Sequence, residues 1–156
     1  VAPRCAIADQ AGSTEFHVTK SISSSSLLRP AGTAHDMPDI FAVKETIPVE
    51  TRTLTDCCAD LGLTSAKMFL KLDIQGGEER ALAGAVPILP QIRGLVAEMP
   101  LQIYYEGQKT FRALDAWITA RGFEIWDIHP AWRHPRTGRL DYMDIMYVRA
   151  PADIPA

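Results

Sequence analysis

The sequence lacks the glycine-rich loops that hold the phosphate groups of many nucleotide ligands. Neither a Gly-x-Gly-x-x-Gly element nor a Walker-type loop occurs among its 156 residues. Such loops cradle phosphates with consecutive backbone N–H groups. Their absence disfavours one class of function, a nucleotide-dependent oxidoreductase half-domain.

Cysteine is scarce as well. The chain has three cysteines, of which Cys57 and Cys58 are adjacent and Cys5 is far away in the sequence. This pattern provides neither a disulfide framework nor the ligand spacing of a zinc site. We therefore expect a reducing, cytoplasmic setting, and no metal ligand is predicted.

The chain also lacks an excess of basic residues and any long apolar run. Its net charge is −3 and its pI is about 5.8. Nucleic-acid binding normally needs a clustered basic face, and a membrane span needs about 20 apolar residues. We expect no nucleic-acid partner and no membrane partner. A local basic group at residues 133–139 has two interpretations, a solvated loop paired with nearby acids or an anion contact, and the first is favoured.

The length of the chain bounds its organisation. A chain of 156 residues is in the single-domain range and can bury one sizeable core. We expect one domain over residues 1–150 and a tail over residues 151–156. Because the first residue is Val1 and a core strand follows at once, we expect a fragment of a longer protein.

The most informative feature is an apolar strand that runs into a glycine turn. Residues 68–74 form a nearly continuous apolar run, which is typical of a central strand covered on both faces. Asp73 stands at its end, before Gly76, Gly77 and Glu78. Open α/β sheets bind ligands in the crevice beyond the carboxyl ends of their strands. Asp73 is therefore predicted to lie at such a crevice.

The first third of the chain reads as short strands. Strands are predicted at residues 4–8 and 14–19, the second with Phe16 and Val18 on its apolar face. The serine-rich segment 21–26 is either a flexible tip or part of a site. Residues 41–53 keep a period of two across Pro48, and an internal proline points to an edge strand. This part is expected to be an added hairpin or meander at the margin of a sheet.

The rest of the chain alternates strand and helix, which predicts a largely parallel sheet with helices on both faces. The last two strands are joined too closely for a helical crossover, so we expect them to pair antiparallel. The prolines after the helix that starts at Glu78 should break or kink it. The predicted elements are helix 54–61, strand 68–74, a helix from residue 78, strand 94–99, a helix capped by Thr110 and stopped by Gly122, and strands 124–129 and 142–148.

Five short motifs occur in order along the chain: Ala6-Ile7-Ala8-Asp9, Ser23-Ser24-Ser25-Ser26-Leu27, Lys71-Leu72-Asp73-Ile74-Gln75-Gly76 with Glu78, Tyr105-Glu106-Gly107-Gln108, and Pro135-Arg136-Thr137-Gly138-Arg139-Leu140 followed by Asp144. Together they resemble the FkbM-type S-adenosylmethionine-dependent methyltransferases, over about residues 4–149. The resemblance implies an α/β fold of the Rossmann-like class I methyltransferase type. In this fold a seven-stranded, mostly parallel sheet carries its last strand inserted antiparallel.

The chain departs from that family at its start. Members carry two upstream strands, one ending in a glycine-rich loop for the methionine part of the cofactor and one ending in an acid for its ribose. The resemblance thus implies a partial methyltransferase domain over residues 1–150 that lacks the first two strands. We expect the parent protein to methylate, whereas the segment by itself is not expected to hold the whole cofactor.

Two carboxylates are predicted to carry the chemistry. Asp73 and Glu98 end neighbouring predicted strands. O-methylation requires a substrate hydroxyl to lose its proton as it attacks the sulfonium methyl, and a carboxylate can accept that proton. Two close acids repel each other, so one of them would have a raised pKa. The alternative for Asp73 is structural, namely that it accepts N–H bonds from the Gly76-Gly77 turn.

The remaining candidates concern cofactor and substrate. The resemblance places Asp9 near the adenine of S-adenosylmethionine, with backbone groups of Ala8 completing its recognition; the alternative is an Asp that caps a turn. Tyr104, Tyr105 and Glu106 follow a strand end and are predicted to bind the substrate. His129 also ends a strand and is an alternative base, although a lone histidine there is more often structural.

Two functions from different classes follow from these residues. The first is an S-adenosylmethionine-dependent methyltransferase that acts on a hydroxyl of a small metabolite, a sugar or a polyketide. The second is a noncatalytic Rossmann-like binding or assembly module, whose open sheet edge pairs with a partner strand or with a second copy in a homo-oligomer.

Overall fold

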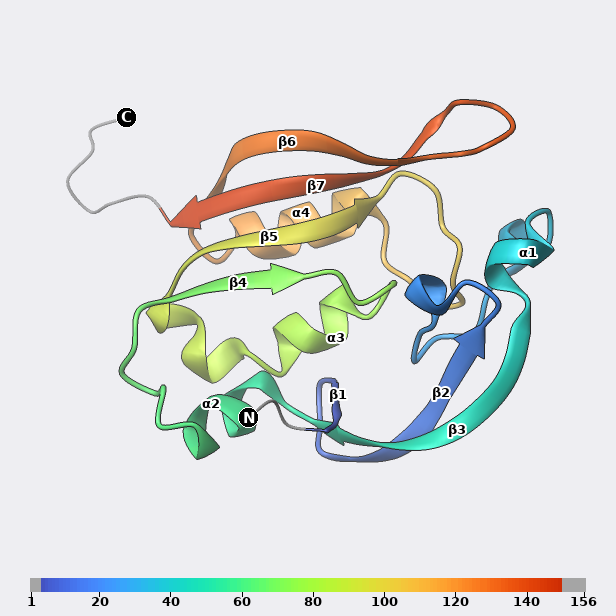
Figure 1. Cartoon of the computed structure of the whole chain (residues 1–156). Coiled ribbons are helices and arrows are strands. Elements are labelled where there is room, and N and C mark those ends of the chain that lie inside the picture. The colour runs from blue at the N-terminus through green and yellow to red at the C-terminus, as the bar shows by residue number, and fades with distance from the viewer. Residues whose placement is uncertain (1–3, 150–156) are drawn as a thin grey trace.

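The computed structural model describes residues 4–149, which form two β-sheets with helices packed beside them (Figure 1). The first residue and the predicted tail at 151–156 lie outside the described residues. The strands are β1 Ala6–Ile7, β2 Gly12–Thr19, β3 Val43–Arg52, β4 Met68–Leu72, β5 Ile92–Pro100, β6 Phe123–Arg133 and β7 Leu140–Arg149. The helices are α1 Pro38–Phe41, α2 Leu54–Asp60, α3 Glu78–Ala83 and α4 Phe111–Thr119, with 3₁₀ helices at Ile22–Ser24, Gly32–Ala34 and Val86–Gln91. The α/β class predicted from the sequence is confirmed.

The small sheet has the strand order β1-β3-β2. β2 and β3 pair antiparallel, as expected for the added hairpin, and β1 joins β3 in parallel. The prediction that 41–53 is an edge strand is wrong, because β3 is the middle strand. Pro48 is tolerated there because β1 pairs only with Thr51 and Arg52, so that β3 has a strand on one side alone at the proline.

The large sheet has the strand order β4-β5-β7-β6. β4 and β5 are parallel, and β7 is antiparallel to both of its neighbours, so β4, β5 and β6 run in one direction. The predicted antiparallel pairing of the last two strands is confirmed. The prediction that β4 is central and covered on both faces is wrong: it is the outermost strand of this sheet, and Phe69 is 57% exposed. A continuous apolar run does not by itself distinguish an edge strand from an inner one.

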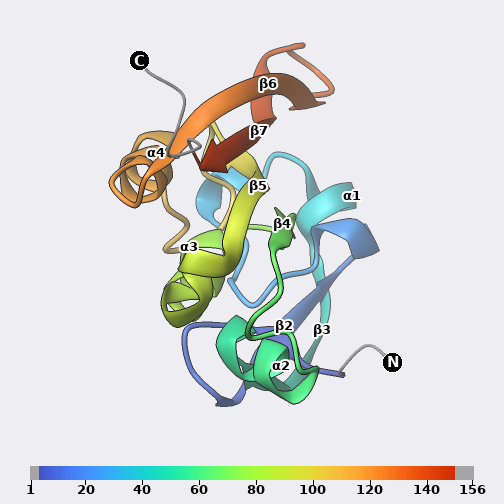
Figure 2. The same ribbon diagram turned by 90° about the vertical axis from the view of Figure 1, so that its left-hand side faces the viewer.

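Helices α2, α3 and α4 cover one face of the large sheet. Side chains of α2, α3 and α4 join a single core cluster with the strand residues Leu72, Leu95 and Ile145. Figure 2 shows α3 and α4 on the same side of this sheet. The expectation of helices on both faces therefore holds only in part for residues 4–149, because the opposite face meets the short helix α1 near its end, where Phe41 clusters with Tyr142. On the opposite face, the side chains of Val96 and Met146 are only half-buried.

The helix ends follow from local sequence. Thr53 and Thr110 cap α2 and α4, because each hydroxyl oxygen accepts the backbone N–H of the residue three positions later. The helix that starts at Glu78 ends at Ala83, and the chain continues as the 3₁₀ helix Val86–Gln91. The 3₁₀ helix contains Pro90, and the predicted break of the helix that starts at Glu78 is confirmed.

The polar face of β2 is the buried one, contrary to the pattern read from the sequence. His17 is 4% exposed and Thr19 is 1% exposed, whereas Phe16 is only half-buried. The serine-rich segment pairs with the free edge of β2, since His17 and Ser26 exchange backbone hydrogen bonds of 2.8 and 3.2 Å. Phe16 thereby faces the cavity described below.

β6 is the other outermost strand of the large sheet, and its edge is modified by a side chain. The backbone N–H of Ile128 donates to Asp127 Oδ1 at 2.8 Å, and Asp127 Oδ2 lies 2.9 Å from His129 Nε2. Trp126 on this strand is 69% exposed. No helix among residues 4–149 has the length and apolar character needed to cross a membrane.

Candidate functional site

Glu78 builds the turn that follows β4. Its side chain is 1% exposed, and its Oε1 accepts the backbone N–H groups of Ile74 at 3.1 Å and of Gly76 at 3.4 Å. The structural role that the sequence offered as an alternative for Asp73 is thus filled by Glu78. Burial raises the pKa of the Glu78 carboxyl, although these backbone bonds oppose the shift. Glu78 Oε2 has no hydrogen-bond partner among residues 4–149.

Asp73 stands at the start of this turn and is accessible. Its side chain is 44% exposed. Asp73 Oδ2 pairs with Lys71 Nζ at 2.8 Å, and Asp73 Oδ1 accepts from Gln75 Nε2 at 3.1 Å. With the turn held by Glu78, the Asp73 carboxylate is available to a ligand.

Glu98 lies beside Asp73, as the sequence predicted. Leu72 pairs with Ala97 in the parallel β4–β5 ladder, which places the next residue of each strand side by side. Burial raises the pKa of the Glu98 carboxyl to about 7, and the negative charges of Asp73, Glu78 and Asp144 add to this effect while Lys71 opposes it. Glu98 therefore changes protonation close to neutral pH.

Gln75 connects the two acids and was not singled out by the sequence. Its Nε2 donates to Asp73 Oδ1 at 3.1 Å and to Glu98 Oε2 at 3.2 Å. Gln75 has a φ of 54°, in the left-handed region that costs a non-glycine residue about 1 kcal/mol. In the sequence, Gln75 could have been recognised by its position between Asp73 and the two glycines. The direction of its amide group, however, is visible only in the folded turn.

Two cavities meet at these residues. Cavity 1 has a volume of about 710 Å³ and is lined by Arg4, Cys5, Ala6, Ile7, Phe16, Ser23, Ser25, Leu27, Ile47, Pro48, Val49, Glu50, Asp73, Ile74, Gln75 and Gly77. Cavity 2 has a volume of about 320 Å³ and is lined by Ser21, Ser23, Ser24, Ile40, Phe41, Asp73, Gln75, Glu98, Ala131, Trp132 and Tyr142. Ser23, Asp73 and Gln75 belong to both walls. The serine-rich segment thus contributes to the walls of both cavities.

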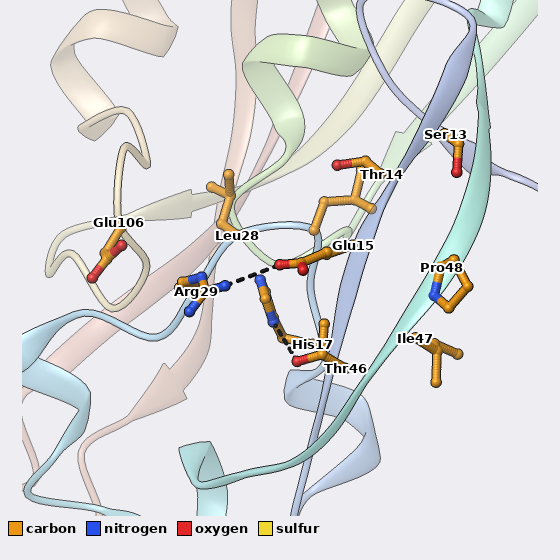
Figure 3. A pocket seen from close by; sticks show the side chains of 11 residues that line it. Ser13, Thr14, Glu15, His17, Leu28, Arg29, Thr46, Ile47, Pro48 and Glu106 are labelled. Carbon is orange, nitrogen blue, oxygen red and sulfur yellow. Dashed lines mark hydrogen bonds and ion pairs between the residues drawn. The ribbon is translucent and has the colours of Figure 1, made fainter.

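A third cavity lies elsewhere along the small sheet. Cavity 3, shown in Figure 3, is lined by polar side chains that include Glu15, His17 and Arg29. Arg29 Nη2 pairs with Glu15 Oε2 at 2.9 Å, and His17 Nδ1 lies 3.1 Å from Thr46 Oγ1. These two pairs occupy part of its polar wall, and neither Asp73 nor Glu98 lies in that wall.

Ala8 and Asp9, the predicted cofactor contacts, lie just past the wall of cavity 1. Ala8 is fully buried, and its N–H donates to Arg52 O at 2.9 Å. Asp9 Oδ1 accepts from Arg80 Nε at 2.8 Å, and this bond lowers the pKa of the Asp9 carboxyl. The preceding residues, 4–7, are the ones that line the cavity.

Tyr104 and Tyr105, the predicted substrate contacts, do not line cavities 1 to 3. They are 1% and 0% exposed and form a second core cluster with Phe41 and Tyr142. Tyr104 donates its hydroxyl hydrogen to Asp141 Oδ2 at 2.5 Å. The Tyr105 hydroxyl lies 2.9 Å from Ser24 O and 3.1 Å from Gln75 Oε1. Tyr105 therefore does not line the cavities itself, but its hydroxyl contacts Gln75, which does.

Glu106 and His129 also lie apart from the two acids. Glu106 lines cavity 3, and His129 pairs with Asp127 on the exposed strand β6. The basic loop follows its solvated interpretation, because Arg136 pairs with Asp36 at 3.3 Å and Arg139 pairs with Asp141 at 2.5 Å.

The described residues do not form a metal site or a disulfide. No group of three or more His, Cys, Asp or Glu side chains suited to a metal ion occurs among residues 4–149. Cys5, Cys57 and Cys58 are free thiols. The junction of cavities 1 and 2 holds the two carboxylates of Asp73 and Glu98, and the pKa of Glu98 is about 7.

Comparison with known proteins adds to this geometry. A family model described as "Methyltransferase FkbM domain" matches residues 1–125. The chain is similar to the 2-O-methyltransferase NoeI of Sinorhizobium fredii (strain NBRC 101917 / NGR234), with 40% identity over 68 residues. This match covers 44% of the chain and 28% of that relative, so it spans less than a third of the relative's length. No solved structure matches the chain.

Proposed function

The chain belongs to the FkbM methyltransferase domain family, and on that premise we propose that it forms the reaction centre of an S-adenosylmethionine-dependent O-methyltransferase. The proposed acceptor is a hydroxyl group of a small metabolite, a sugar or a polyketide. The relative NoeI is named as a 2-O-methyltransferase, which supports oxygen as the methylated atom.

The observation that carries the proposal is the wall shared by cavities 1 and 2. A methyl transfer needs a donor and an acceptor that approach each other in line. Two separate cavities that meet at Asp73, Gln75 and Ser23 provide such an arrangement. We assign cavity 1 to the donor and cavity 2 to the acceptor.

The residues of cavity 1 suit S-adenosylmethionine. The cavity volume of about 710 Å³ is within the range of cofactor sites. Phe16, Ile47 and Val49 give it an apolar wall for a flat ring, while Asp73 and Glu50 bring negative charge for a cationic donor. When bound, S-adenosylmethionine supplies an electrophilic methyl group on a positively charged sulfur.

Glu98 is the proposed general base of cavity 2. As the acceptor oxygen bonds to the methyl carbon and the methyl–sulfur bond breaks, the hydroxyl proton moves to the Glu98 carboxylate. Its pKa of about 7 suits this role, because a base of that pKa is half ionised at neutral pH and still holds a proton well. Asp73, next to the junction, remains to bind the acceptor hydroxyl or a neighbouring polar group.

We further propose that the two sheets belong to one Rossmann-like class I methyltransferase domain. The order β4-β5-β7-β6, with β7 antiparallel between β5 and β6, supports this assignment for the large sheet. The small sheet would flank the donor side, because residues of β1, β2 and β3 line cavity 1.

Replacement of Asp73 tests the function. Asp73→Asn keeps the size of the side chain but removes its charge, and because the residue is 44% exposed we expect no loss of fold. In the full protein, methyl transfer from [methyl-³H]S-adenosylmethionine to a panel of neutral methyl glycosides, polyols and macrocyclic polyketides should fall by about 10- to 100-fold. The surface variant Asp39→Asn, which alters only the exposed pair with Lys20, is the matched control. An unchanged rate for Asp73→Asn would show that Asp73 has no part in the reaction.

One observation favours the binding or assembly module as a second candidate. β4 is the outermost strand of its sheet and carries the exposed Phe69, so a partner strand could pair with its free edge. Calorimetry with S-adenosylmethionine separates the two functions. A methyltransferase binds the donor in this chain or in a longer one, whereas a module binds it in neither.

A further inference from the structure

Gln75 adopts a backbone conformation that its own residue type does not favour. Among residues 4–149 it is the non-glycine residue with a positive φ, and the hydroxyl of Ser26 holds its carbonyl oxygen with a hydrogen bond of 2.7 Å. Glycine would adopt this φ without strain. Any advantage of Gln75 over glycine at this position therefore lies in its side chain.

The Gln75 carboxamide is bonded at both of its ends. Its two N–H hydrogens go to two different carboxylates, Asp73 at 3.1 Å and Glu98 at 3.2 Å, while its oxygen lies 3.1 Å from the Tyr105 hydroxyl. A flipped amide would place its oxygen against the Lys71-paired carboxylate of Asp73, and the repulsion between these two acceptors favours the orientation described. The amide is thus a neutral donor inserted between two acids.

The contact with Gln75 uses only one oxygen of Glu98. Glu98 Oε2 accepts from the amide, whereas Oε1 makes no hydrogen bond within the described residues and is not sealed from solvent. Glu98 lies in the wall of cavity 2. Oε1 is therefore the oxygen that can receive a proton from a ligand in that cavity.

We propose that Gln75 is a positioning residue for methyl transfer, which holds the Asp73 and Glu98 carboxylates apart and leaves Glu98 Oε1 free for the acceptor hydroxyl. Without a donor between them, two neighbouring acids either turn away from each other or share one proton in a direct hydrogen bond. Either outcome removes the base from the junction of the cavities. This inference rests on the proposed function for its catalytic part, but the geometry of the bridge can be tested without it.

The test replaces the amide by groups of similar length in the full protein. Gln75→Met removes both N–H donors, and Gln75→Glu places a third carboxyl between the two acids. The control is Gln10→Met, at an exposed turn. Protein labelled with ¹³C at glutamate carboxyls is titrated by NMR, and the Glu98 signal is assigned by its loss in Glu98→Gln.

We expect the midpoint of the Glu98 titration to rise by about one pH unit in Gln75→Met, because the ionised carboxylate loses a hydrogen bond. In Gln75→Glu the midpoint should also rise. The methyl-transfer rate of both variants at pH 7 should fall at least about tenfold through kcat, with the KM for S-adenosylmethionine changed less than about threefold. Gln10→Met should match the unaltered protein in every measurement.

The outcomes separate this inference from the proposed function. An unchanged Glu98 midpoint in both variants, or an unchanged rate at pH 7, would overturn the role of Gln75. If the unaltered protein does not bind S-adenosylmethionine in calorimetry, the proposed function fails, while the titration still decides whether Gln75 controls Glu98. Circular dichroism shows whether each variant is folded, and Gln75→Glu, which keeps the shape of the side chain, decides the case if Gln75→Met does not fold.

Discussion

At the scale of single residues, the Glu98 carboxyl connects activity to pH. Its pKa of about 7 results from burial and from the neighbouring negative charges of Asp73, Glu78 and Asp144. If Glu98 is the base, the methyl-transfer rate should rise with pH through about 7, and at pH 5 it should be about 100-fold below its plateau. A rate profile between pH 5 and 9 checks this. The rise should be absent from the residual activity of Glu98→Gln, and a profile that keeps the same midpoint in that variant would assign the titration to another group.

The same carboxyl should make the fold less stable as pH rises. The folded-state pKa of Glu98 is raised from 4.5 to about 7, so between these values the folded protein binds a proton that the unfolded chain has lost. The free energy of unfolding therefore decreases as pH rises across this window, by about 3 kcal/mol for this group. Urea unfolding should show Glu98→Gln to be more stable than the unaltered protein at pH 8, with the advantage lost by pH 4. Glu124→Gln, at an exposed position of β6, should show no such pH-dependent gain.

The sequence indicated some of these residues and not others. Asp73 and Glu98 were placed together because parallel neighbouring strands end at the same edge of a sheet. Gln75 was missed as a partner of the two acids because its contacts depend on the path of the turn, in which Gly76 has a φ of 93° and Gln75 a φ of 54°. A residue pattern gives the positions of such groups along a strand but not the direction of a side chain within a turn.

At the scale of elements, the approach of α3 to β1 shapes the proposed donor side. Gly84 directly follows α3, and a Cβ atom at this position would collide with the carbonyl oxygen of Ala8 and lie 3.2 Å from Thr53 Cβ. The φ of Gly84 is −70°, which any residue can adopt, so the need for glycine is steric. This contact places the segment before Ala8, which lines cavity 1, against the end of α3.

Gly84→Ala should therefore displace β1. We expect a loss of about 1–3 kcal/mol in the free energy of unfolding, since backbone atoms have to move. The free energy of S-adenosylmethionine binding should be weakened by more than the free energy of unfolding, because residues 4–7 belong to the wall of cavity 1. Urea unfolding and calorimetry measure the two effects. Gly32→Ala is the control, because a Cβ there meets nothing within 4 Å; equal donor affinities in the two variants would contradict the role of the contact.

The helices and strands were predicted better than the order of the strands in each sheet and the burial of their side chains. Caps such as Thr53 and Thr110 and the alternation of apolar residues are local signals, and the helices and strands that depend on them were found near their predicted places. The sequence did not predict that β3 lies inside its sheet or that β4 lies at the edge of its own sheet. Strand order depends on contacts between segments that are distant in the sequence. The burial of His17 was missed for the same reason, since the segment at Ser26 that pairs with its backbone lies further along the chain.

At the scale of the whole molecule, the two sheets predict an uneven pattern of local stability. β5 and β7 have a hydrogen-bonded strand on each side, whereas β4 and β6 have one side free and β3 has a full-length partner on one side only. Amide hydrogen exchange should therefore be slowest in β5 and β7 and faster in β3, β4 and β6. Exchange followed by mass spectrometry or NMR checks this order. Protection of β4 equal to that of β5 would indicate that its edge is covered in solution.

The carboxylate of Asp127 makes the outer edge of the large sheet less prone to aggregate in concentrated solution. Long exposed strands with apolar side chains invite other molecules to add on and can start fibrils. β6 presents Ile125, Trp126 and Ile128, but the N–H of Ile128, which an incoming chain would need, is already occupied by Asp127. This side chain therefore protects the strand edge against aggregation, and because its hydrogen bonds to Ile128 and His129 lower the pKa of the Asp127 carboxyl, the protection persists into acidic solution.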